Sequence, residues 1–153
     1  MTEVQSIDRP VTDDVASMTV AQAMHPGVLT CPPEAPLVTV ARMMDAYRVH
    51  CVVVFTDGED DTGAGVWGIV SDLDLAAAVA DGDLEGRSAG GTAATPVVTV
   101  GPDETLRRAA QLMSEYGTAH VVVTEPEAYR PLGIVSTLDL ARIVARPAAP
   151  TSD

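Results

Sequence analysis

The sequence contains no lysine, and aromatic residues are scarce: one Trp, one Phe and three Tyr among 153 residues. Nine Arg stand against 22 Asp and Glu, which gives a formal net charge of −13. Nucleic acid and anionic membrane surfaces are recognised through basic faces, so we expect neither as a partner. No apolar run approaches the roughly 18 residues that a membrane-spanning helix needs, and the N-terminus lacks the pattern of a signal peptide. We therefore expect a cytoplasmic protein.

Motifs for metal binding and catalysis are also missing. The two cysteines, Cys31 and Cys51, are expected to be free and buried in a cytoplasmic setting. Neither Cys-x-x-Cys nor His-x₃-His spacing is present, so no metal site is predicted. No Gly-x-Ser-x-Gly motif, Walker loop or nucleophile–base pair is found, which argues against an enzyme and against a required cofactor. With 46% apolar residues the chain should nonetheless fold, as one domain or as two halves packed together.

The dominant feature of the sequence is an internal repeat. Residues 68–76 and 133–141 are identical at eight of nine positions, at a spacing of 65 residues. Upstream the spacing is 69 residues, as three matched pairs show: Thr30 and Thr99, Leu37 and Leu106, Tyr47 and Tyr116. The register changes between Phe55 and Val66, where the first copy carries a longer acidic turn, and insertions belong in turns. The repeat predicts two copies of one structural unit.

Each copy is predicted to fold as β-α-β-β-α. In the first copy, an extended piece at residues 28–30 precedes an amphipathic helix at 37–47, whose apolar residues recur at i, i+3, i+4 and i+7. A valine-rich strand without alternation follows at 51–55, as is typical of a strand buried on both faces. A strand at 66–70 and a helix at 72–80 complete the unit. The second copy repeats these elements at residues 97–100, 105–116, 120–124, 132–135 and 137–145.

The two copies divide the chain into five parts. The expected parts are a flexible N-terminal segment at 1–17, the first repeat at 18–80, a linker at 81–92, the second repeat at 93–145 and a flexible tail at 146–153. The 81–92 segment is rich in Gly and Asp, a composition typical of linkers. Pro147 prevents the tail from continuing a helix. Thr19 is placed to cap a short helix that runs to about Met24, at the start of the first repeat.

Both copies carry Ser-x-x-Asp where the last strand gives way to the last helix: Ser71 and Asp74 in the first, Ser136 and Asp139 in the second. Free backbone N–H groups and the positive end of the helix dipole favour an anion at such a helix start. A carboxylate one turn further on can point back at a sugar edge. The same pattern is a near match to a capping box, which closes a helix and binds nothing. The two interpretations are compatible, and the duplication favours a ligand site.

The order of elements, the size of each copy and the closing Gly-Ile-Val-Ser-x-x-Asp-Leu resemble the CBS domain family over about residues 18–145. The resemblance implies an α+β fold in which tandem β-α-β-β-α repeats pack sheet to sheet with pseudo-two-fold symmetry and leave two related clefts. It also implies that these clefts bind AMP, ADP, ATP or S-adenosylmethionine. In the family's ligand signature the Asp binds ribose hydroxyls and the Ser reaches phosphate or ribose. These roles fall on Ser71, Asp74, Ser136 and Asp139.

Two histidines immediately before the valine-rich strands are candidate phosphate contacts. By resemblance, nucleotide-binding members of the family carry a His-Arg pair here that touches phosphate. His50 matches the His of that pair, while Cys51 stands at the Arg position. In the second copy Ala119 replaces the His, and His120 stands at the Arg position. Each copy keeps at most half of the pair, and an exposed strand-edge histidine without a ligand is the alternative for both His50 and His120.

The copies differ at the first position of the last helix, where the first copy has Asp72 and the second has Thr137. A carboxylate there satisfies the helix dipole and repels a nearby phosphate. We therefore predict that the side formed by Ser136, Thr137 and Asp139 tolerates phosphate better than the side formed by Ser71, Asp72 and Asp74.

Two functions from different classes fit the sequence. One is a cytosolic regulatory sensor that reads an adenosyl ligand and passes a shape change to a separate effector protein. The other is a ligand-free dimerisation scaffold with degenerate clefts. By resemblance a homodimer formed through the helices is expected in either case.

Overall fold

The structure is a computed structural model, and it describes residues 11–57, 64–93, 97–126 and 130–146. Three segments for which the sequence carried expectations fall wholly or partly outside these ranges. They are the start of the N-terminal segment (1–10), the body of the acidic turn (58–63) and the tail (147–153).

The first repeat forms the predicted β-α-β-β-α unit. Its elements are β2 (Thr30–Cys31), α3 (Leu37–Tyr47), β3 (Cys51–Asp57), β4 (Ala64–Ser71) and α4 (Asp72–Asp81). The strands form a sheet in the order β2-β3-β4, with β2 parallel and β4 antiparallel to the central β3. Leu37 and Val40 of α3 pack on Val52, Val54 and Val70, and all five side chains are fully buried. The apolar spacing of the helix thus matches one face of the sheet.

The second repeat has the same construction. Its elements are β5 (Thr99–Val100), α6 (Leu106–Tyr116), β6 (His120–Thr124), β7 (Pro131–Ser136) and α7 (Thr137–Ala145). The sheet order is β1-β7-β6-β5, in which β1 (His25–Pro26) is contributed by the segment that precedes β2 of the first repeat. The prediction of two equivalent units is confirmed.

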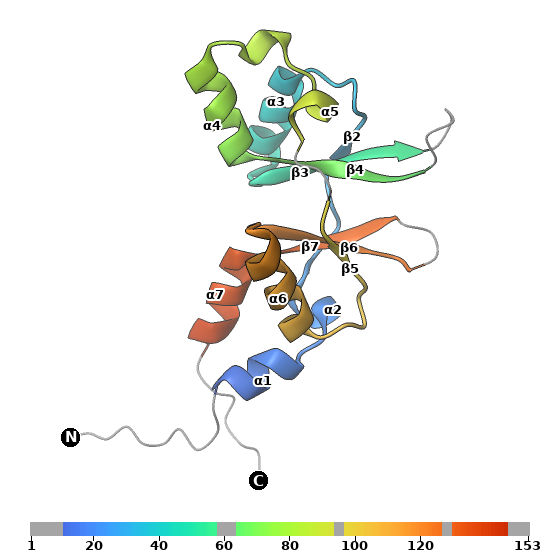
Figure 1. The fold of residues 1–153 in the computed structure, drawn as a ribbon, viewed down its shortest axis with the longest axis vertical. Coiled ribbons are helices and arrows are strands. Elements are labelled where there is room, and N and C mark those ends of the chain that lie inside the picture. The colour runs from blue at the N-terminus through green and yellow to red at the C-terminus, as the bar shows by residue number, and fades with distance from the viewer. Residues whose placement is uncertain (1–10, 58–63, 94–96, 127–129, 147–153) are drawn as a thin grey trace, which may run out of the picture.

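The two sheets face each other across a shared apolar layer. This layer contains Cys51, Val53 and Ile69 from the first repeat and Val122 from the second. Figure 1 shows the two sheets one above the other, with the long helices on their outer faces. Each central strand is therefore covered on both sides, by its own helices and by the opposite sheet. This double burial explains why the valine-rich strands lack alternation, and it confirms sheet-to-sheet packing.

Short helices before and between the two units each pack against the unit that does not directly follow them in the chain. Before β2 lie α1 (Val11–Ser17) and α2 (Val20–Ala23), and between α4 and β5 lie the 3₁₀ turn η1 (Leu84–Gly86) and α5 (Ala89–Thr92). Val20 is fully buried in the core of the second repeat, whereas Ala89 is fully buried in the core of the first. The Val20 N–H donates to the Glu104 carbonyl at 2.8 Å, and the Ala89 N–H donates to the Ala35 carbonyl at 2.8 Å. The segment before β2 thus completes the core of the second repeat, and the segment before β5 completes the core of the first.

These short elements differ in part from the sequence expectations. Thr19 caps α2 through a capping box with Gln22, as its position predicted. Residues 11–17, expected within a flexible segment, form α1 on the second repeat. The segment expected as a linker carries η1 and α5, both packed on the first repeat. The composition gave no sign of these ordered helices. They are held in the cores by single buried residues such as Val20 and Ala89, which leave no helical periodicity in the sequence. Within the described ranges, no helix is both long and apolar enough to cross a membrane.

Candidate functional site

Two clefts lie where the sheets meet, and the repeat relates them to each other. The Ser71 cleft has a volume of about 500 Å³ and is lined by Ile69, Ser71, Asp72, Leu73, Asp74, Val97, Val98, Tyr116, Gly117, Thr118, Ala119 and His120. The Ser136 cleft has a volume of about 340 Å³ and is lined by His25, Pro26, Gly27, Val28, Leu29, Arg48, Val49, His50, Cys51, His120, Ile134, Ser136, Leu138 and Arg142. Both volumes fall in the range of roughly 300–1,000 Å³ typical of small-molecule sites. Each cleft takes its Ser from one repeat and part of its wall from the other.

Ser71 and Asp74 are fixed at the start of α4 by a complete capping box. One carboxylate oxygen of Asp74, Oδ2, accepts from the backbone N–H of Ser71 at 2.7 Å and from its hydroxyl at 3.1 Å. The Asp74 N–H in turn points to Ser71 Oγ at 3.4 Å. The cap uses Oδ2 and orients the carboxylate so that Asp74 still lines the cleft. The capping and ligand-binding interpretations are therefore compatible at this position.

The same cap is repeated at α7, where the carboxylate has an additional partner. Asp139 Oδ2 accepts from the Ser136 N–H at 2.7 Å and from its hydroxyl at 3.0 Å. Asp139 Oδ1 lies 2.5 Å from Nε2 of His25, which comes from β1. The Asp139 side chain is only 5% exposed, while that of His25 is 60% exposed. His25, rather than Asp139, therefore faces the Ser136 cleft.

The other two histidines lie near the boundary between the clefts. His50 Nδ1 is 3.1 Å from Asp72 Oδ2, and both side chains are exposed. His50 lines the Ser136 cleft and Asp72 lines the Ser71 cleft, so this pair bridges their rims. His120 is partly buried and lines both clefts. Burial lowers the pKa of His120, although the nearby carboxylate of Asp72 acts in the opposite direction. A neutral imidazole is thus favoured between the two sites.

The structure brings most of the predicted site residues to the clefts. Ser71 and Asp74 line one, Ser136 and His50 line the other, and His120 lines both. Thr137 is exposed and is not among the described residues that line either cleft. Asp139 lies behind His25. Asp72 lines the Ser71 cleft, where a carboxylate would disfavour phosphate as expected.

Three residues that shape the Ser136 cleft were not predicted from the sequence: Arg48, Arg142 and His25. Arg48 follows α3 as its C-cap, Arg142 lies on α7 and His25 lies on β1. They come from three separated segments, and only the tertiary fold joins them. A signal was present, because each arginine stands where the other copy has a small residue.

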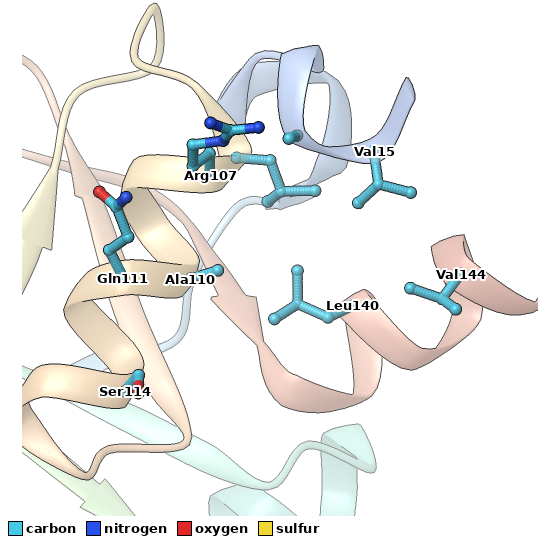
Figure 2. A pocket seen from close by; sticks show the side chains of 9 residues that line it. Val15, Arg107, Ala110, Gln111, Ser114, Leu140 and Val144 are labelled. Atoms are coloured by element: carbon cyan, nitrogen blue, oxygen red, sulfur yellow. The ribbon is translucent and has the colours of Figure 1, made fainter. Parts of the chain in front are cut away.

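A third cavity, of about 580 Å³, lies away from the clefts between α1, α6 and α7 (Figure 2). Val15, Leu140 and Val144 border it on one side, and Arg107 and Gln111 lie along α6. It is larger than either cleft, but its walls are mostly apolar. Its described lining also has no serine at a strand-to-helix junction like Ser71 or Ser136, so it is not a candidate for the same ligand.

Two β-α-β-β-α units with facing sheets and paired clefts define a tandem-repeat module. The model of the family described as CBS domain matches residues 20–81 and 92–146, one match for each repeat. The chain belongs to the CBS domain family and forms a CBS domain pair. A search of curated proteins gave no match.

Solved structures share this fold. The CBS domain pair of protein MJ0100, in complex with 5′-methylthioadenosine and S-adenosyl-L-methionine, has a TM-score of 0.72 at 20% identity, covering 83% of this chain and 95% of that one. CBSX2 in complex with AMP has a TM-score of 0.67 at 20% identity, covering 82% and 95%. An uncharacterised conserved protein from Pyrococcus horikoshii has a TM-score of 0.74 at 18% identity, covering 89% and 98%. At these identities the likeness establishes the fold.

Proposed function

We propose that this chain is a cytosolic regulatory module that binds an adenosyl ligand in the clefts between its two CBS repeats and signals to a separate effector protein. The ligand class comprises AMP, ADP, ATP, S-adenosylmethionine and related compounds. The observation that carries the proposal is the duplicated cleft, which in each copy lies at a strand-to-helix junction closed by a Ser–Asp cap. The complexes of MJ0100 and CBSX2 named above, with adenosyl compounds in the same fold, support the choice of ligand.

The Ser71 cleft has the chemistry that a nucleoside needs. Ile69, Val97 and Val98 provide apolar walls against which a flat purine can pack. Asp74, whose Oδ2 is held by the cap, presents a carboxylate edge that can accept hydrogen bonds from ribose hydroxyls. A purine on an apolar wall and a ribose on a fixed carboxylate together define adenosyl recognition here.

A thermal-shift panel tests this function. AMP, ADP, ATP, S-adenosylmethionine, 5′-methylthioadenosine and adenosine are each added to the purified protein, with a pyrimidine nucleotide as control. A ligand present at 100 times its Kd stabilises the folded state by about 2.7 kcal/mol, which raises the Tm by several degrees. Asp74→Asn should reduce the shift from adenosine, while the matched charge change Asp45→Asn on the exposed face of α3 should not. No shift with any adenosyl compound would refute the proposal.

The scaffold alternative is favoured by a different observation. The exposed large apolar residues form three pairs related by the repeat: Tyr47 and Tyr116, Leu73 and Leu138, Val79 and Val144. All lie on α3, α4, α6 and α7, the helices expected to form a homodimer interface. Exposed apolar side chains that recur in this way are typical of a surface covered by a partner.

Sedimentation of the wild-type protein and a Val79→Asp/Val144→Asp variant tests the dimer. The wild type should sediment as a dimer and the variant as a folded monomer. A monomeric wild type would exclude this homodimer. A dimer that binds no adenosyl compound would favour the scaffold.

A further inference from the structure

The two clefts carry opposite charge. The described lining of the Ser71 cleft contains the carboxylates of Asp72 and Asp74 and no arginine. The Ser136 cleft is lined by Arg48 and Arg142, and its carboxylate, Asp139, is covered by His25. Guanidinium groups bind phosphate through charge-assisted hydrogen bonds, whereas exposed carboxylates repel it. A phosphate therefore meets attraction in one cleft and repulsion in the other.

This difference comes from a few substitutions between the two copies. Arg48 corresponds to Gly117, and Arg142 corresponds to Ala77. The Ser136 cleft is thus positive because each copy contributes one arginine to it, at a position where the other copy has a residue without a polar side chain. Each arginine can therefore be replaced by the residue that stands at the corresponding position of the other copy.

Arg48 occupies a backbone position that favours glycine. Its φ is 56°, and among the described residues it is the non-glycine residue with positive φ. Gly117, its counterpart, has a φ of 61° at the same helix C-cap. An arginine in this conformation is strained relative to glycine, and such strain is retained where a side chain serves a site. Arg48 lines the Ser136 cleft, where its guanidinium can serve a bound ligand.

His25 removes the charge conflict that a phosphate would otherwise meet. Its ring lies on Asp139 Oδ1, so the buried carboxylate does not face the cleft. In the Ser71 cleft, by contrast, Asp74 is itself one of the lining residues. The ribose-binding carboxylate is thus available in one cleft and covered in the other.

We propose that the two clefts bind different classes of adenosyl ligand. The Ser136 cleft takes a ligand with a phosphate, held by Arg48 and Arg142. The Ser71 cleft takes a phosphate-free ligand, neutral or cationic, through Asp74. This inference rests on the proposed function and adds to it the ligand class of each cleft.

Calorimetric titration with AMP and 5′-methylthioadenosine tests the division. Both compounds carry the adenosyl group, but only AMP carries a phosphate. The double variant Arg48→Gly/Arg142→Ala converts both positions to the residues of the other copy. It should weaken AMP binding by at least tenfold and leave 5′-methylthioadenosine within about twofold of wild type. Asp74→Asn should produce the reverse pattern.

A control separates local from general charge effects. Arg108→Ala/Arg146→Ala removes the same charge at exposed positions outside both clefts, and it should leave AMP binding within about twofold. If wild type binds neither compound, the proposed function itself fails. If it binds both but the Arg48→Gly/Arg142→Ala variant weakens them equally, or weakens neither, only the division between clefts is overturned.

Discussion

The imidazole of His25 lies 2.5 Å from the carboxylate of Asp139, and this contact joins β1 to the start of α7. It ties the segment that precedes β2 to the Asp of the Ser-x-x-Asp motif in the second repeat. It also distinguishes two carboxylates whose caps are otherwise nearly identical, those of Asp74 and Asp139. The same motif can thus be accessible in one cleft and covered in the other.

Replacing His25 by alanine should uncover Asp139 and create a second site for a phosphate-free ligand. The number of 5′-methylthioadenosine molecules bound per chain should rise from about one to about two in a calorimetric titration. His25→Gln keeps a side-chain donor near Asp139, so its stoichiometry should stay at the wild-type value. An unchanged stoichiometry in His25→Ala would show that His25 does not block the site.

Arg48→Gly should stabilise the fold. A non-glycine residue in the left-handed conformation costs about 1 kcal/mol, and glycine removes this cost. The free energy of unfolding in urea should therefore increase by about 1 kcal/mol. Arg146→Gly is the matched control, because Arg146 is also a helix C-cap but has a φ of −63°, where glycine brings no such gain. Equal changes in the two variants would contradict this account of Arg48.

Gly133→Ala should destabilise the second repeat. A Cβ at this position would collide with the backbone carbonyl oxygen of His25 and lie 2.8 Å from the Met24 sulfur, so β1 would have to move away from β7. We expect a loss of about 2–3 kcal/mol in urea unfolding. Gly86→Ala, where the added Cβ meets no atom within 4 Å, should change stability by less than about 1 kcal/mol.

Stability should decrease in mild acid because of His120. Burial lowers its pKa below the ordinary value of 6.5 and outweighs the raising effect of the carboxylates of Asp72, Asp139 and Asp74, while His50 lowers the pKa further. The unfolded chain therefore binds a proton at higher pH than the folded protein. The stability from neutral His120 is fully present above about pH 6.5 and is lost as the pH falls through the folded-state pKa.

Urea unfolding of wild type and His120→Asn at several values between about pH 7.5 and pH 5 measures this effect. Wild type should lose more stability over that interval than the variant, because Asn does not titrate. Parallel pH dependences would show that His120 is not the group responsible.

The two thiols should be unreactive in the folded protein. Burial, with the nearby charges of Asp72 and Asp139, raises the pKa of Cys51 from 9.0 to about 12, and burial followed by the charge of Glu34 raises that of Cys31. For Cys51 near pH 8, this reduces the thiolate fraction about 1000-fold. Iodoacetamide followed by intact mass measurement should show no modification of the native protein and two additions in denaturant. Rapid native labelling would place a thiol at the surface.

The elements of each repeat could be predicted from the sequence because local signals determine them. The spacing of Leu37, Val40 and Met44 defines one face of a helix, and the uninterrupted valines define a strand buried on both sides. Ser71 and Ser136 were found because a helix cap is a local motif that needs only four residues.

The crossing segments and the charge of the clefts could not be predicted in the same way. Val20 and Ala89 are single anchors, and no periodicity indicates which repeat each one enters. His25, Arg48 and Arg142 meet only through the packing of β1, α3 and α7 around one cleft. Differences between the two copies marked the arginines, but only their spatial arrangement gives those differences a meaning.

The burial of Val20 in one repeat and of Ala89 in the other links the folding of the two halves. Because Val20 completes the core of the second repeat and Ala89 that of the first, neither repeat closes its core with its own leading segment. The second repeat in particular needs the segment that contains Val20, which is separated from it in the chain by the whole first repeat. Because the core of the second repeat is closed from the other end of the chain, we expect the two halves to unfold as one cooperative unit.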